Sequence, residues 1–110
     1  MVTGKNKEQF EKWYFNDYLK LDTPPKMPKA FMILFYKERF ERQKGVYEAY
    51  YDSLGSIDIE TECRPLWNGA EEKEHQFLIN RIYQKGVFKT RNEAYQEAFK
   101  QADKLINDKL

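Results

Sequence analysis

The 110-residue chain has little of what catalytic and metal sites are usually built from: one cysteine, one histidine and five scattered glycines. With Cys63 as the only cysteine, no intramolecular disulfide can form, which excludes a secreted disulfide scaffold. His75 has no second histidine for a metal site and no recognisable triad around it. The glycines never cluster as phosphate-binding loops require. We therefore predict a protein that is not an enzyme, with no catalytic residue, no metal and no cofactor.

The chain also lacks a long apolar run and an excess of one charge. Its longest apolar stretch, residues 30–36, is far shorter than the roughly 18 residues that span a membrane. The N-terminus has no signal-peptide pattern. Lysine and arginine number 19 against 18 aspartates and glutamates, so net charge identifies no partner. These absences predict a cytoplasmic protein with no membrane partner.

What the chain does have is aromatic residues, at 16% of its length. Bulky rings bury large apolar areas, so they can build a core in an otherwise polar sequence. A length of 110 residues fits one domain, and we expect residues 1–110 to form it.

Helical periodicity begins near the N-terminus. Asn6 followed by Gln9 resembles a capping box, and apolar residues recur at helical spacing behind it. This pattern predicts a first helix over residues 7–20. The proline-containing segment 22–28 should end it, because proline fixes φ and removes a backbone donor.

A second helical stretch covers residues 29–53. Its apolar stripe keeps nearly helical spacing, and Gly45 inside it lowers helix stability by about 1 kcal/mol relative to alanine. One long helix and two short helices both fit this pattern. Gly55 is placed to end the segment in the left-handed conformation.

The pattern then changes to the two-residue period of strands. Residues 57–63 alternate apolar and acidic side chains, so we expect one buried face that ends in Cys63 as a small buried hydrophobe. Residues 64–74 follow as a loop, with His75 solvated beside it. Residues 76–83 have apolar residues of both parities, which is typical of a strand covered on both sides. A short third strand is expected near residues 87–88.

The last helix has the strongest signal. Thr90 and Glu93 form a capping box, and an apolar face with several alanines follows. Together the patterns predict an α+β fold: N-terminal helices, a small antiparallel sheet of two or three strands, and a C-terminal helix packed on the sheet.

Two segments resemble small uncharacterised proteins of phages and prophages in Bacteroidetes-type hosts. Residues 35–37 read F-Y-K and residues 40–55 read F-E-R-Q-K-G-V-Y-E-A-Y-Y-D-S-L-G. Those proteins typically carry F-Y-K-L-P-F-x-M-Q-x-G-V-Y-x-x-F-F-D-S-V-G. Residues 88–94, F-K-T-R-N-E-A, are similar to their closing pattern F-x-T-R-x-E-A. The resemblance implies a phage context and no particular activity. At residues 38–39 this chain has Glu-Arg where the family has Leu-Pro, which favours one longer helix there.

Trp67 is the first candidate for an interaction residue. It stands in a segment that contains proline and glycine, flanked by Arg64 and Leu66, and a large ring in a loop is a candidate anchor for a partner. The alternative is that the ring folds back over the core.

The acidic residues of the first strand are the second candidate. Asp58, Glu60 and Glu62 should share one strand face, where they form either a solvated surface or a contact for a basic partner. The surplus of rings on the first helix, namely Trp13, Tyr14, Phe15 and Tyr18, could bury itself in a homodimer or against a host protein.

We therefore expect a non-catalytic, phage-encoded accessory protein that binds a host macromolecule in the host cytoplasm and modulates or inhibits it, for host takeover or anti-defence. The alternative is a nucleic-acid-binding module similar to double-stranded RNA-binding domains, which recognise shape and phosphate. Its phosphate contacts would be Lys85, Lys89, Arg91, Lys100 and Lys104.

Overall fold

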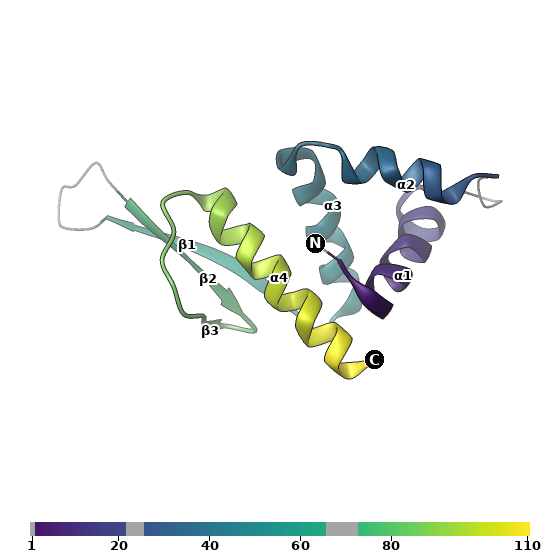
Figure 1. Ribbon diagram of the computed structural model, residues 1–110. Helices are drawn as coiled ribbons and strands as arrows, with labels where there is room; N and C mark the ends of the chain where they lie inside the picture. The colour runs from purple at the N-terminus through teal and green to yellow at the C-terminus, as the bar shows by residue number, and fades with distance from the viewer. Residues whose placement is uncertain (1, 22–25, 66–72) are drawn as a thin grey trace.

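The computed structural model describes residues 2–21, 26–65 and 73–110 and has the α+β architecture that the sequence predicts (Figure 1). Its elements, in chain order, are helix α1 (Gly4–Trp13), which continues as the π-helical segment η1 (Tyr14–Tyr18), helices α2 (Pro28–Tyr36) and α3 (Phe40–Leu54), strands β1 (Ile59–Pro65), β2 (Lys73–Ile79) and β3 (Ile82–Tyr83), and helix α4 (Arg91–Lys109). The molecule is elongated, 55 × 28 × 20 Å.

The sheet is antiparallel with strand order β1-β2-β3. Helix α4 packs on β1 and β2 and covers one face, as predicted, while the other helices gather at the opposite end of the molecule (Figure 1). Small side chains permit the close approach of helix and sheet, since Ala94, Ala98 and Ala102 are all fully buried. Thr90 Oγ1 accepts a hydrogen bond from the Glu93 amide at 3.1 Å, so this half of the predicted capping box is confirmed.

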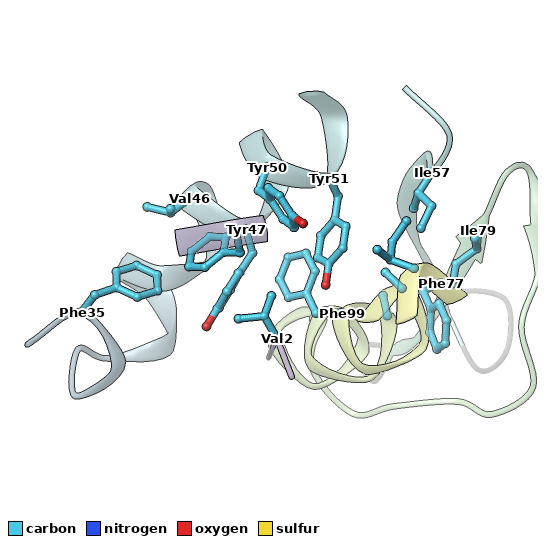
Figure 2. Close-up of a cluster of buried hydrophobic side chains, with 14 of the residues drawn as sticks. Val2, Phe35, Val46, Tyr47, Tyr50, Tyr51, Ile57, Phe77, Ile79 and Phe99 are labelled. Carbon is cyan, nitrogen blue, oxygen red and sulfur yellow. The ribbon is translucent and has the colours of Figure 1, made fainter. Parts of the chain in front are cut away.

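A continuous aromatic core joins the helices to α4. Tyr47 and Tyr51 point from α3 toward Phe99 of α4 (Figure 2), and the ring centre of Tyr50 lies 5.1 Å from that of Phe10 on α1. The Phe99 ring centre lies 5.5 Å from that of Tyr47 and 5.9 Å from that of Tyr51. Phe77 supplies the main ring on the sheet side. One core therefore spans both parts of the molecule.

The start of the first helix differs from the prediction. Thr3 is the N-cap position, and Asn6 lies inside α1, fully buried. The Asn6 side chain does not cap α1, because its Nδ2 donates to Asp103 Oδ1 of α4 at 2.7 Å. The Asn6 side chain, which the local pattern predicts as a cap, thus forms a tertiary hydrogen bond instead.

Residues 29–53 form parts of two helices, and the break lies at residues 37–39. The expectation that Glu38 and Arg39 would favour one longer helix is therefore wrong. Arg39 is extended, with φ −64° and ψ 149°, and Gln43 Nε2 donates to the carbonyl oxygens of Phe35 and Tyr36, at 3.1 and 3.2 Å. The bond to Tyr36 pairs a carbonyl at the end of α2, and the bond to Phe35 adds to the one that its carbonyl already accepts from the Glu38 amide at 3.0 Å. Gly55 ends α3 at φ +70°, as predicted.

The predicted strand over residues 76–83 is in fact two strands and a tight turn. Asn80 and Arg81 both have positive φ, 54° and 66°, which reverses the chain between β2 and β3. The apolar residues of both parities do not mark a strand covered on both sides, because Ile82 and Tyr83 are 66% and 54% exposed.

His75 lies in β2 and not in a solvated loop. Its backbone exchanges two 2.8 Å hydrogen bonds with Phe88, an isolated bridge at the position where a third strand was expected. The third strand is β3 instead. Across the sheet, His75 pairs with Cys63. Cys63 is partly exposed, whereas the sequence predicted that it would be buried.

Candidate functional site: interaction surfaces

The predicted loop anchor is only partly covered by the structure. Trp67 and Leu66 lie outside the described residues. Arg64 stands on β1, exposed, and its guanidinium donates a hydrogen bond to Gln76 Oε1 on the neighbouring strand. This contact keeps Arg64 on the face of the sheet that points away from α4.

The predicted acidic face is exposed. Asp58 precedes β1, and Glu60 and Glu62 alternate with the residues that face α4. Glu62 accepts a hydrogen bond from the Tyr83 hydroxyl, and this bond raises the pKa of Tyr83. The face of the sheet that points away from α4 is therefore solvent-exposed and acidic along β1, as the alternation of apolar and acidic residues predicts.

The basic residues of the nucleic-acid alternative do not form an unbroken stripe. Lys85, Lys89, Arg91, Lys100 and Lys104 are all exposed. On α4, helical spacing places Lys100 and Lys104 on the same side as Glu93 and Glu97. These carboxylates would lie among the phosphate contacts and oppose them.

The aromatic surplus of the first helix is mostly internal. Phe15 is only 8% exposed and meets Phe31 of α2 at 5.7 Å between ring centres, and Trp13 and Tyr14 pack against the core. Phe15 therefore belongs to the core and is not part of an aromatic interface. Tyr18 keeps 46% of its surface exposed.

Four exposed apolar side chains lie on α2 and at its start, and the sequence analysis did not single them out. Only Met32 and Phe35 of this helix are buried. Met27 at the N-cap and Phe31, Ile33 and Leu34 within the helix are 71%, 42%, 51% and 68% exposed. We call these four residues the α2 apolar face. The run of apolar residues 30–36 was the signal, since a helix on the surface can bury only one side of such a run.

The charges within residues 26–37 have one sign. Lys26, Lys29 and Lys37 are exposed, and residues 26–37 include no aspartate or glutamate. Soluble monomers rarely expose contiguous apolar patches of this kind unless the patch binds something. An apolar surface with a basic border is thus the clearest interaction feature of the described chain.

A groove of about 480 Å³ runs between α1 and the end of α3, lined by Trp13, Asp17, Tyr50 and Leu54 among others. In the parts of the chain that the structure covers, no three His, Cys, Asp or Glu side chains gather as metal ligands would.

Among the described helices, none is long and apolar enough to cross a membrane. Comparison with protein-family models, with curated proteins and with solved structures finds no match to this chain. Any function therefore has to be inferred from the chain's own residues and their geometry.

Proposed function

We propose that this is a non-catalytic interaction protein, a phage-encoded accessory factor that docks a host protein on the α2 apolar face and modulates or inhibits it. The observation that supports this proposal is the exposure of Met27, Ile33 and Leu34 by more than half on a helix whose other side is fixed to the core. The phage context comes from the sequence resemblance alone.

The spacing of the face suggests how it binds. Phe31 and Leu34 stand at positions i and i+3 of α2, a spacing with which helices insert into apolar grooves, and Met27 lies just before the helix at its N-cap position. Each such side chain gains roughly 1.5 to 3 kcal/mol when it moves from water into an apolar site. The partner should therefore offer an elongated apolar groove.

The lysines indicate the border of that groove. Lys26, Lys29 and Lys37 would face acidic side chains on the partner, which would raise the association rate and the salt sensitivity of binding. The same lysines oppose a homodimer through this face, because two copies would bring like charges together.

The helix is presented in a fixed position. Met32 and Phe35 are 2% and 7% exposed, and the two hydrogen bonds from Gln43 hold the last carbonyls of α2. A preformed helix has less conformational entropy to lose on binding, so affinity is not reduced by folding of the segment.

The test is affinity capture from a lysate of the bacterial host with three baits. The wild type should capture a partner, and the variant Met27→Ser/Leu34→Ser should recover at least about tenfold less of it. Leu105→Ser is the matched control, because Leu105 is a 40% exposed leucine on α4. All three baits should melt alike, since the substituted side chains are exposed.

Equal capture by all three baits would show that the α2 apolar face is not the docking surface. A membrane surface with anionic lipid would also bind exposed lysines and apolar side chains. Flotation with vesicles rich in anionic lipid distinguishes this alternative from a protein partner. Recovery of the wild type with those vesicles, abolished by Met27→Ser/Leu34→Ser, would replace the protein partner by a lipid surface.

A second candidate is binding of structured nucleic acid, favoured by the order of elements α3, β1, β2, β3 and α4. This helix, three-strand, helix order is the one expected of a double-stranded RNA-binding module, and the basic candidates on it are exposed. Its test is titration of duplex RNA at rising salt. Phosphate-driven binding must weaken steeply with salt, and weak, salt-insensitive binding would dismiss it.

A further inference from the structure

We propose that the free edge of β1 is a second docking site, which takes up an extended basic segment of a partner protein as an added strand. This goes beyond the proposed function, because the edge lies at the other end of the molecule from α2 (Figure 1). Strand addition needs unpaired backbone groups on an accessible edge and side chains that select the incoming strand. Both are present at β1.

The hydrogen bonds around β2 show which backbone groups of β1 are unpaired. The amide of Asn80 donates to the Asp58 carbonyl at 2.8 Å, so residue 58 faces β2. The odd-numbered residues of β2 point their backbone amide and carbonyl groups away from β1. His75 exchanges hydrogen bonds with Phe88, and the Phe77 carbonyl accepts from the Gln84 amide at 3.0 Å. The even-numbered residues of β2 therefore face β1.

The register of the β1–β2 pair shows which residues of β1 point their backbone groups outward. Thr61 stands opposite Phe77 and Cys63 opposite His75, so the odd residues of β1 point their backbone groups away from β2. Strand β1 is at the margin of the sheet. Ile59, Thr61 and Cys63 thus direct their amide and carbonyl groups outward, and no described residue forms a hydrogen bond with them.

The surroundings of this edge are acidic. Asp58, Glu60 and Glu62 are exposed along it. Where the strand starts, a cavity of about 90 Å³ separates Ile59 from α3 and α4, and it is lined by Glu48, Tyr51, Asp52, Ile59 and Tyr95. An incoming strand would therefore run beside carboxylates on the strand and on α3.

Charge decides between a second copy of this chain and a different partner. An antiparallel copy of β1 centred on Thr61 places Glu60 opposite Glu62 on both sides of the centre, whereas one centred on Glu62 places that residue opposite itself and Glu60 opposite Arg64. Like charges directly opposite are destabilising, and edge carboxylates are a known protection against self-pairing. A strand with lysine or arginine at alternate positions meets the same carboxylates favourably.

The probe for this site is a blocked hexapeptide of alternating lysine and valine, with its glutamate–valine counterpart as the control. Binding of the lysine peptide should slow hydrogen exchange of the Thr61 and Cys63 amides, measured by NMR, because they gain partners in the added strand. The glutamate peptide should leave these amides unprotected. Equal binding of the two peptides, or protection elsewhere only, would overturn the proposal.

Two variants then test the backbone and the charges separately. Thr61→Pro removes an outward donor without touching the β1–β2 ladder and should weaken binding about tenfold, the loss expected for a strand-edge hydrogen bond and its neighbours. Unchanged binding by a folded Thr61→Pro protein would refute strand addition. Glu60→Lys/Glu62→Lys leaves the backbone intact and should reverse the preference to the glutamate peptide, and retention of the lysine preference would refute the charge selection. Concentration-dependent dimers of the wild type, blocked by Thr61→Pro, would make a second copy the occupant and overturn the basic partner.

Discussion

The two ends of α4 are held in different ways. Its C-terminal half is tied to the helices by buried polar groups, because Asp103 is 8% exposed and its carboxylate accepts from the Thr3 amide at 2.8 Å and the Asn6 side chain at 2.7 Å. Its N-terminal half lies on the sheet through alanines and a few large side chains such as Phe77. The helical end is therefore specified by directional bonds, and the sheet end by shape alone.

The difference extends to what each end leaves exposed. At the helical end the hydroxyl of Tyr50 also joins the polar cluster, since it donates to Asn6 Oδ1 at 2.5 Å. At the sheet end the Nδ1 atom of His75 is buried without a hydrogen-bond partner among the described residues. The outer face and one edge of the sheet are uncovered. Buried hydrogen bonds favour one arrangement of the helices, and the open sheet retains surface for a partner.

The largest expected effect is the loss of stability when a buried phenylalanine is truncated. One such residue at each end of the molecule allows the two ends to be compared. Phe99→Ala should lower the free energy of unfolding by about 4 kcal/mol and Phe77→Ala by about 3 kcal/mol, because truncating a buried ring leaves a cavity. Phe99 is surrounded by the rings of Phe40, Tyr47, Tyr51 and Tyr95, whereas among the described residues Phe77 has only Phe88 within ring contact. Urea denaturation followed by circular dichroism checks both. A greater loss in Phe77→Ala would reverse the comparison.

Removing the central acceptor of the polar cluster comes next. Asp103→Ala should cost about 3 kcal/mol, since the buried Asn6 amide and the Thr3 amide and hydroxyl all lose a charged acceptor. Asp103→Asn keeps the shape and one acceptor oxygen, so its loss should be about half as large. The same denaturation experiment measures both. If the two variants lost equal stability, the negative charge of the carboxylate, and not the retained acceptor oxygen or the shape, would hold this end of α4.

These two ends were not equally predictable from the sequence. The sheet end follows from local patterns, since the alternation over 57–63 and the Thr90 capping box are short-range signals. The role of Asn6 could not be found this way, because Asp103 lies 97 residues further along the chain. A capping pattern and a buried tertiary partner use the same residue type, and only the fold decides between them.

The candidate site was predicted less well for a related reason. Strand alternation correctly placed Glu60 and Glu62 on an exposed face. The exposure of Leu34 depends on how α2 lies across α1 and α3, and no local pattern specifies which side of an almost uniformly apolar helix faces solvent. The reversal at Asn80 and Arg81 was missed because neither residue is glycine, the usual marker of such a turn.

Alkaline pH should affect the helical end before the sheet end. Burial is the main cause that raises the pKa of Tyr50 to about 12, from an ordinary value of 10.0. The folded protein thus keeps a proton that the unfolded chain releases, so the stability from this residue is complete below pH 10 and is lost as pH rises through about 12. Urea denaturation across this range should show a steeper decline for the wild type than for Tyr50→Phe. Parallel declines would contradict it.

The smallest expected effect is a gain, and it lies at the sheet end. Asn80 and Arg81 have φ values of 54° and 66°, the left-handed pair that a two-residue hairpin turn requires. Asn80 is suited to this conformation and is further held by its side chain, which accepts from the Asp58 amide at 2.8 Å. Arg81 has no such compensation, and a side chain at positive φ costs roughly 1 to 2 kcal/mol.

Arg81→Gly should remove this strain. Glycine gives back part of the gain through the greater entropy of the unfolded chain, so the net increase in unfolding free energy should be about 0.5 to 1 kcal/mol. The matched control is Gly55→Ala at the end of α3, where φ is +70° and an added Cβ meets nothing within 4 Å. That variant should lose about 1 kcal/mol from backbone strain alone. A loss of stability in Arg81→Gly would mean that the arginine side chain holds the hairpin, and that the sheet end is fixed by more than shape.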